Sequence, residues 1–130
     1  MSTPRSIVLG PLKAPMMRLA TQGSEVAGIL VGRVEGDTAI AYYLHLARNV
    51  RESPVEFEAE PWHVVQAHVS AETYGLEVIG VFHTHPVCPP RPSARDVEGM
   101  KRWPYIWVIA CSSEVEAWTP EAEPRPVEVL

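Results

Sequence analysis

A continuous apolar run that ends in two histidines constrains the fold of this chain more than any other feature. Residues 76–82 (Leu-Glu-Val-Ile-Gly-Val-Phe) are rich in apolar and β-branched side chains, which predicts a buried strand. His83 and His85 follow directly, separated by Thr84. Because strand side chains alternate, both imidazoles are expected on one face, at the carboxyl end of the strand. In α/β folds this end is where loops gather and functional groups lie.

Asp96 follows at the start of a predicted short helix over residues 94–102. Two neutral imidazoles and one carboxylate form the ligand set of an open catalytic zinc site, which leaves the fourth position to water. We therefore predict one Zn²⁺ per chain, bound by His83, His85 and Asp96. A single histidine at the end of a strand is usually only a polar residue at the rim. Two histidines on one face, followed by an aspartate at this spacing, favour a metal-binding site.

Other residues around this run have structural interpretations. Ser93 and Asp96 are spaced as a helix N-cap and the acid at the third helical position, which would also aim Asp96 at the metal. Thr84 is predicted to point to the opposite face and to pack there. Cys88 lies in the proline-rich loop of residues 86–92 and is expected to be a thiol with no role, although competition for zinc is an alternative. Cys111 is expected to be a small buried side chain.

The pattern of His83, one residue, His85, seven residues, Ser93, two residues and Asp96 resembles the signature of the JAMM (MPN+) metallopeptidase family. The family also places a glutamate before a Gly-rich apolar strand, and Glu25 matches that position. The resemblance implies that Glu25 takes a proton from a zinc-activated water and later gives it to the leaving amine. It also implies that the Ser93 hydroxyl stabilises the oxyanion. The compact prokaryotic members imply a ubiquitin-like or sulfur-carrier protein as partner, cut after its C-terminal glycines at a peptide or isopeptide bond.

The order of predicted elements indicates an α/β fold with a mixed sheet and helices packed on it, in a single domain over residues 1–130. The family resemblance implies, more finely, a cytidine-deaminase-like arrangement of this sheet. Helices are expected at residues 12–21, 62–74 and 94–102, with Gly75 ending the second, and a loop at residues 48–60. Strands are expected at residues 26–34, 38–46, 77–83, 105–111 and 114–119, with a last edge strand at 125–130.

Composition narrows the possible partners. The formal net charge of −5 argues against binding to a nucleic-acid backbone, and no apolar run approaches the length of a membrane span. The first residues lack the plan of a signal peptide, so a cytoplasmic location is expected. Two other functions stay open: a non-catalytic MPN scaffold and a RadC-like DNA-associated domain. The oligomeric state is not predicted by the sequence.

Overall fold

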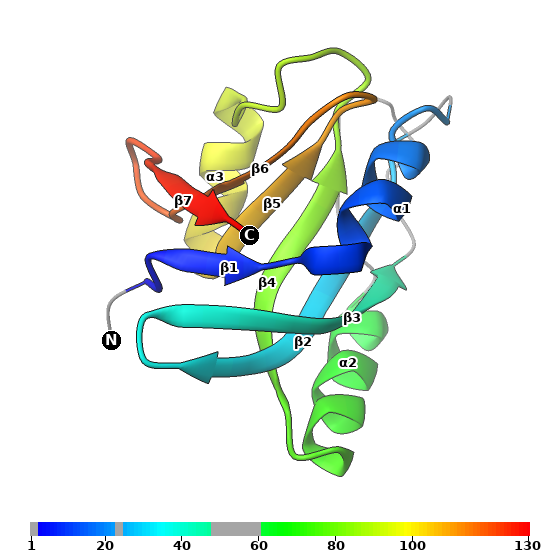
Figure 1. Ribbon diagram of the computed structural model, residues 1–130, viewed down its shortest axis with the longest axis vertical. Helices are drawn as coiled ribbons and strands as arrows, with labels where there is room; N and C mark the ends of the chain where they lie inside the picture. The colour runs from blue at the N-terminus through cyan, green and yellow to red at the C-terminus, as the bar shows by residue number, and fades with distance from the viewer. Residues whose placement is uncertain (1–2, 23–24, 48–60) are drawn as a thin grey trace.

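A mixed sheet with helices on its faces forms the framework of the protein (Figure 1). The computed structural model describes residues 3–22, 25–47 and 61–130. The elements in these ranges are β1 (Ser6–Val8), η1 (Gly10–Leu12), α1 (Lys13–Leu19), β2 (Ala27–Glu35), β3 (Thr38–Ala47), α2 (Pro61–Thr73), β4 (Glu77–Thr84), α3 (Ala94–Arg102), β5 (Ile106–Ala110), β6 (Val115–Trp118) and β7 (Pro126–Val129). No helix within these ranges has both the length and the apolar character needed to cross a membrane.

The strands follow the order β1-β3-β2-β4-β5-β6-β7, and β7 pairs again with β1, so that the sheet closes into a barrel. β4 lies at the centre, antiparallel to β2 and parallel to β5. Except for its first residue, β4 is buried along its whole length. A strand that is covered on both faces needs apolar side chains on both, which explains the continuous apolar run in the sequence.

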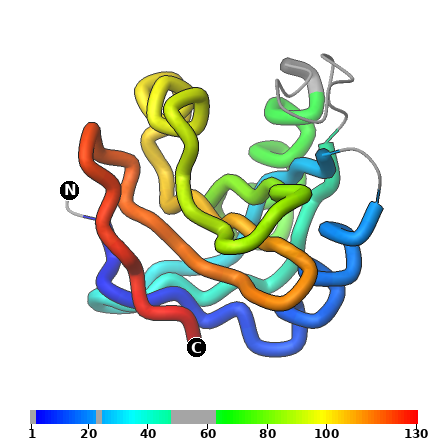
Figure 2. Tube along the Cα trace, turned by 90° about the horizontal axis from the view of Figure 1, so that it is seen from above, coloured from blue at the N-terminus to red at the C-terminus, as the bar shows by residue number. Residues whose placement is uncertain are grey.

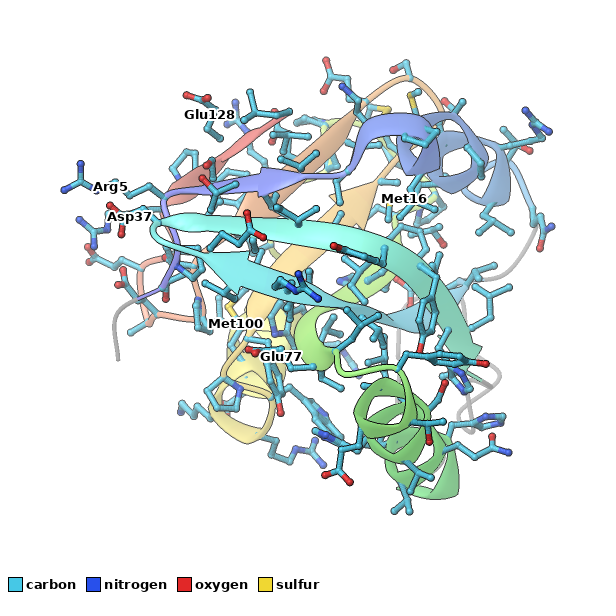
Figure 3. All side chains as sticks on the ribbon, turned by 60° about the horizontal axis from the view of Figure 1, so that its bottom comes forward. Arg5, Met16, Asp37, Glu77, Met100 and Glu128 are labelled. Atoms are coloured by element: carbon cyan, nitrogen blue, oxygen red, sulfur yellow. A yellow bond between two sulfur atoms is a disulfide. The ribbon has the colours of Figure 1, made fainter. Side chains whose placement is uncertain are left out.

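The interior of the barrel is the main hydrophobic core, and every strand contributes to it. Its buried members are Ile7, Leu9, Met16, Ala20, Leu30, Ala39, Ile79, Phe82, Ile106, Val108, Ala110, Ala117 and Val127. α1 supplies Met16, which is fully buried and labelled in Figure 3. The same core therefore holds together the two ends of the chain and the central strand.

α2 and α3 cover the outer face of the sheet, on the side away from α1 (Figure 2). α3 packs through Met100 against a cluster made by Val81, Trp107, Ile109 and Trp118. α2 packs through Ala67 against Ile29 and Val78. α2 ends near Gly75, as predicted, where a positive φ of 68° suits glycine because it lacks a Cβ.

The mixed α/β sheet with packed helices is confirmed, and most predicted elements lie within two residues of the observed ones. The predicted helix at residues 12–21 begins as a 3₁₀ turn, η1, before α1. The predicted loop at residues 48–60 lies outside the described residues.

The prediction of an edge strand at the end of the chain was wrong, because β7 has a partner on each side. That second partner, β1, was not predicted. β1 is also tied to the β2–β3 turn, where the Arg5 amide donates to the Asp37 carbonyl at 2.8 Å (Figure 3).

Candidate metal centre

The predicted site residues come from three segments of the chain that meet at one end of β4. His83 is the second-last residue of that strand, and His85 is the first residue after it. Asp96 lies in the first turn of α3. Glu25 precedes β2, and the register pairs Ala27 of β2 with His83. Because β2 and β4 are antiparallel neighbours, the start of one lies beside the end of the other.

The Asp96 carboxylate lies between the two imidazoles. Its Oδ1 is 3.0 Å from Nε2 of His83, and its Oδ2 is 3.0 Å from Nε2 of His85. The centroids of the two rings are 4.9 Å apart. His83 and Asp96 are buried, with 1% and 8% of their surface exposed. The three residues predicted to bind zinc thus converge through polar atoms that metals prefer.

Ser93 caps α3 and fixes Asp96. The Ser93 hydroxyl accepts from the Asp96 amide at 3.2 Å, and the Ser93 amide donates to Oδ2 of Asp96 at 2.8 Å. These two bonds make the capping box that the sequence predicts. A hydroxyl that accepts one bond still has its own hydrogen to donate, so capping leaves Ser93 able to stabilise an anion.

The position of α3 depends on close packing against β5. A Cβ on Gly99 would lie 2.7 Å from the ring of Trp107, so only glycine lets the helix approach this closely. The Trp107 indole N–H donates to the Trp103 carbonyl at 2.9 Å. The same indole meets His83 edge to face, with centroids 5.5 Å apart. Trp107 therefore orients both the helix that carries Asp96 and the ring of His83.

Glu25 is the second carboxylate near the histidines. Its Oε1 is 3.9 Å from Nδ1 of His83, and its side chain is 7% exposed. Glu25, His83 and His85 each offer a ligand atom within 4.8 Å of one another. Both carboxylates are therefore near enough to take part in the chemistry of the site.

The electrostatic surroundings shift the pKa values of these groups in different directions. Burial raises the pKa of the Glu25 carboxyl above its usual value, although the charges of His83 and His85 oppose the shift. Burial acts on Asp96 in the same way, but the hydrogen bonds from both histidines outweigh it and hold the pKa of Asp96 well below its usual range. Burial lowers the pKa of His83, yet the contacts with Asp96 and Glu25 outweigh burial and raise it.

These residues fit a zinc ion. Ligand atoms about 2.0 Å from a tetrahedral zinc lie roughly 3.3 Å from one another. Each imidazole Nε2 already lies 3.0 Å from an oxygen of Asp96, which is close to that separation. Imidazole and carboxylate are also the donor types that zinc binds. Each imidazole thus has a carboxylate oxygen of Asp96 beside the nitrogen that would bind the ion.

The loop between His85 and Ser93 is tied to the sheet by a disulfide between Cys88 and Cys111. The prediction that Cys88 is a loop thiol without a role was therefore wrong. Cys111 is buried, as predicted. The signal for the pair lies in the topology: β4 and β5 are parallel neighbours, so the residues after His85 come out beside those after Ala110. A second anchor is the Trp118 indole N–H, which donates to the Pro90 carbonyl at 3.1 Å.

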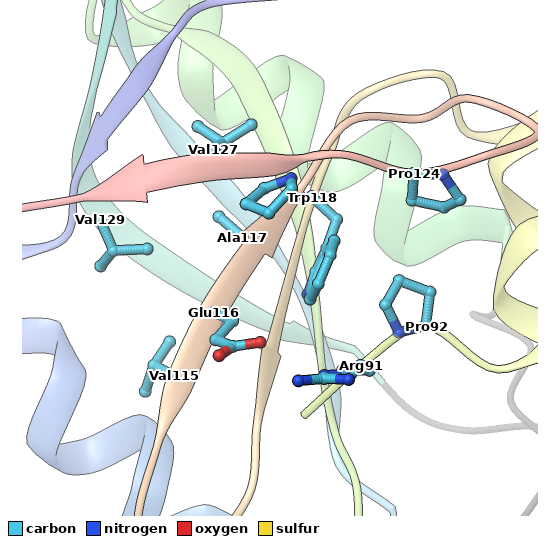
Figure 4. A pocket seen from close by; sticks show the side chains of 10 residues that line it. Arg91, Pro92, Val115, Glu116, Ala117, Trp118, Pro124, Val127 and Val129 are labelled. Carbon is cyan, nitrogen blue, oxygen red and sulfur yellow. The ribbon is translucent and has the colours of Figure 1, made fainter. Parts of the chain in front are cut away.

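The same loop forms one wall of a groove of about 700 Å³ (Figure 4). Arg91 and Pro92 line it on the loop side, and Glu116 and Trp118 line it on β6. His83, His85 and Asp96 are not among its lining residues, so the groove lies beside the histidine cluster and not over it. The register places Ile109 of β5 between His83 and Glu116.

Comparison with known proteins places this chain in a family. Residues 15–121 match the family described as prokaryotic homologs of the JAB domain. A desampylase from Pyrococcus furiosus is 42% identical over 108 residues, which cover 82% of this chain and 74% of that protein. A probable TtuB-protein conjugate cleaving protease from Thermus thermophilus is 31% identical over 129 residues, covering 98% of this chain and 81% of that protein.

Solved structures share the fold of this chain. A protein from Desulfitobacterium hafniense superposes with a TM-score of 0.79 at 25% identity and covers 95% of this chain and 91% of its own. A JAB1/MPN domain protein from Archaeoglobus fulgidus superposes with a TM-score of 0.57 at 21% identity, covering 96% of this chain and 98% of its own, and shows likeness of fold alone. The chain belongs to the JAMM/MPN family of isopeptidases, as a prokaryotic JAB-domain member.

Proposed function

We propose that this protein is a zinc-dependent isopeptidase that cleaves after the C-terminal glycines of a ubiquitin-like or sulfur-carrier protein. The observation that carries the proposal is the meeting of His83, His85 and Asp96 at the end of β4, with Glu25 beside them. The names of the two relatives, a desampylase and a TtuB-protein conjugate cleaving protease, support the same class of substrate.

The opposite pKa shifts of the two carboxylates support different roles for them. Asp96, whose pKa is lowered, stays ionised and suits a metal ligand together with His83 and His85. Glu25, whose pKa is raised, suits a group that takes and returns a proton. Pairs of carboxyl groups whose surroundings push their pKa values apart commonly divide the work of catalysis in this way.

A bound Zn²⁺ supplies a Lewis acid that brings the pKa of water near neutrality. The carboxylate of Glu25 takes the proton of the attacking water and hands it to the nitrogen of the leaving amine. The Ser93 hydroxyl, held by the capping box, donates to the oxygen on which negative charge develops. Asp96 and the two histidines hold their positions through the packing of α3 and Trp107.

The preference for glycine follows from the loop of residues 86–92. This loop holds four prolines and is joined to β5 by the disulfide, so it is a stiff wall. A substrate side chain beside the histidines would meet this wall, whereas the Gly-Gly end of a ubiquitin-like protein would not. An extended tail also binds through its main chain, which requires little side-chain recognition.

The test uses a sulfur-carrier protein with the ubiquitin fold, extended by several residues beyond its Gly-Gly end. Incubation with the zinc-loaded enzyme should release the extension, and the mass of the product should place the cut after the last glycine. Replacement of that glycine by leucine should block cleavage, and an isopeptide-linked conjugate tests the second bond type. Equal cleavage of the leucine variant would mean a general peptidase. Absence of both zinc binding and cleavage would mean a non-catalytic scaffold.

A further inference from the structure

Thr84 lies between the two histidines but faces the other way. It is the last residue of β4 and only 2% of its surface is exposed. Because strand side chains alternate, its side chain points to the face opposite those of His83 and His85. It therefore cannot touch a substrate that reaches the histidines, and the prediction from the sequence is that it only packs.

The hydrogen bonds of Thr84 differ from those of an ordinary strand residue. In an antiparallel bonded pair, two residues exchange both of their N–H···O=C bonds. Here the Thr84 amide donates to the Val26 carbonyl at 2.9 Å, as expected. The Val26 amide, however, donates to the Thr84 hydroxyl at 2.9 Å. The side chain of Thr84 thus replaces its own carbonyl in the pairing of β2 with β4.

This exchange leaves the Thr84 carbonyl for His83. Nδ1 of His83 lies 3.3 Å from that oxygen. When Nδ1–H donates there, Nε2, which lies 3.0 Å from Oδ1 of Asp96 in the metal-free site, is the nitrogen left to bind the metal. A backbone carbonyl that accepts from the second nitrogen of a ligating histidine also fixes the orientation of the ring.

The hydrogen bond from the Val26 amide to the Thr84 hydroxyl affects the segment that carries Glu25. Val26 follows Glu25 and precedes Ala27, the first residue of β2. The two bonds between Val26 and Thr84 therefore extend the pairing of the strands by one residue, to the residue next to Glu25. Without them the backbone that carries Glu25 would lose its attachment to β4.

We propose that Thr84 is a positioning residue of this site, whose hydroxyl holds Val26 in place for Glu25 and frees the Thr84 carbonyl to orient His83. Its effect on turnover rests on the proposed function. Its effects on the Val26 amide, on the tautomer of His83 and on zinc affinity do not depend on which substrate is cut.

The test compares Thr84→Val, which keeps the shape but removes the hydroxyl, with Thr84→Ser, which keeps the hydroxyl. In the valine variant the Val26 amide either loses its acceptor or takes the carbonyl from His83. We expect a loss of about 10- to 100-fold in kcat or in zinc affinity, the usual size for a partner of a metal ligand. KM should stay unchanged, because the side chain faces away from the substrate. The serine variant should stay within about threefold of the original protein.

Two further measurements do not use activity. Amide exchange of zinc-free protein reports the Val26 N–H, and ¹⁵N NMR of the imidazoles reports the tautomer of His83. In Thr84→Val, either the exchange rate of the Val26 amide or the tautomer of His83 should change. In Thr84→Ser, both should stay as in the original protein. If the valine variant does not fold, the NMR spectrum of the original protein still decides, since it must show His83 protonated at Nδ1 with zinc bound. Unchanged kcat, exchange and tautomer in the valine variant, or equal defects in both variants, would overturn the proposal. Failure of the original protein to cut any Gly-Gly fusion would instead count against the proposed function.

Discussion

The two carboxylates beside His83 lie in surroundings that treat negative charge differently. Asp96 accepts from the Ser93 amide and lies within 3.0 Å of Nε2 of both His83 and His85, and these neighbours stabilise its ionised form. Glu25 lies farther from His83, at 3.9 Å, and burial favours its protonated form. A site with one fixed negative charge and one exchangeable proton is suited to hydrolysis, in which a proton must move from water to the leaving group.

Glu25→Gln tests this division. The change removes the proton acceptor and keeps the shape, so turnover should fall by about 10²- to 10⁴-fold while zinc content and melting temperature stay close to those of the original protein. Hydrolysis of the Gly-Gly fusion and metal analysis measure the two effects. Glu77→Gln is the matched control, because Glu77 is exposed at the far end of β4 and should be neutral (Figure 3). Unchanged turnover in Glu25→Gln would show that Glu25 is only structural.

The metal-free protein should lose the stabilising effect of two bound protons as the pH rises, that of Glu25 above pH 4.5 and that of His83 above pH 6.5. The raised pKa values of Glu25 and His83 mean that the folded protein holds these protons more tightly than the unfolded chain, with reference values of 4.5 and 6.5. This stability is present at low pH and is lost as each proton leaves. The lowered pKa of Asp96 acts only in stronger acid, where stability falls as the pH drops below 3.8.

Zinc affinity should follow the opposite trend, because protons compete with the metal for His83 and His85. Melting temperatures of chelator-treated and zinc-loaded protein across this pH range measure both slopes. Asp96→Asn should flatten the slope of the metal-free protein above pH 6.5, since His83 then lacks the carboxylate that raises its pKa. A metal-free melting temperature that rises as the pH increases above 6.5 would contradict the stabilisation of protonated His83 by Asp96 and Glu25.

Among the secondary-structure elements, the connection from β4 to α3 carries most of the site. It begins at His85, ends at Ser93, and is held by the Cys88–Cys111 disulfide and by the Trp118 bond to Pro90. The sequence predicted this loop and the helix after it, because prolines and the N-cap are local signals. The disulfide was not predicted, since it depends on the parallel pairing of β4 with β5, which no local pattern records.

Cys88→Ser/Cys111→Ser should therefore lower the stability of the protein. Closing a loop over a separation of 23 residues is worth about 3 kcal/mol in a chain-entropy estimate. Chemical unfolding of the variant and of the oxidised protein gives the difference in the free energy of unfolding. The original protein treated with reductant is the control, and it should approach the variant, because Cys88 is exposed. Equal stability of all three forms would mean that the loop is held without the disulfide.

The whole molecule differs from the predicted fold in one respect, the closure of the sheet. Apolar runs and turn signals predicted strands β2 to β6, and alternation predicted β7. β1 has three residues and shows none of these patterns, and its pairing with β3 and β7 joins segments far apart in the chain. The site was easier to predict than the closure, because four of its five residues follow one another closely in the sequence. Thr84 was recognised only as a packing residue, since the role of its hydroxyl depends on the register with Val26.

If closure makes the barrel one cooperative unit, a cavity under β1 should destabilise the whole protein. Ile7 is fully buried in the core shared by all seven described strands, so Ile7→Ala should cost about 2–5 kcal/mol. Leu46→Ala is the matched control on β3, where the side chain is 49% exposed, and it should cost less than about 1 kcal/mol. Urea unfolding followed by both tryptophan fluorescence and circular dichroism should show one transition in each variant, because Trp107 and Trp118 lie on the strands that the core supports. Separate transitions in Ile7→Ala, or equal costs for the two changes, would show that β1 is an appendage and that the metal centre is held by β2, β4, β5 and α3 alone.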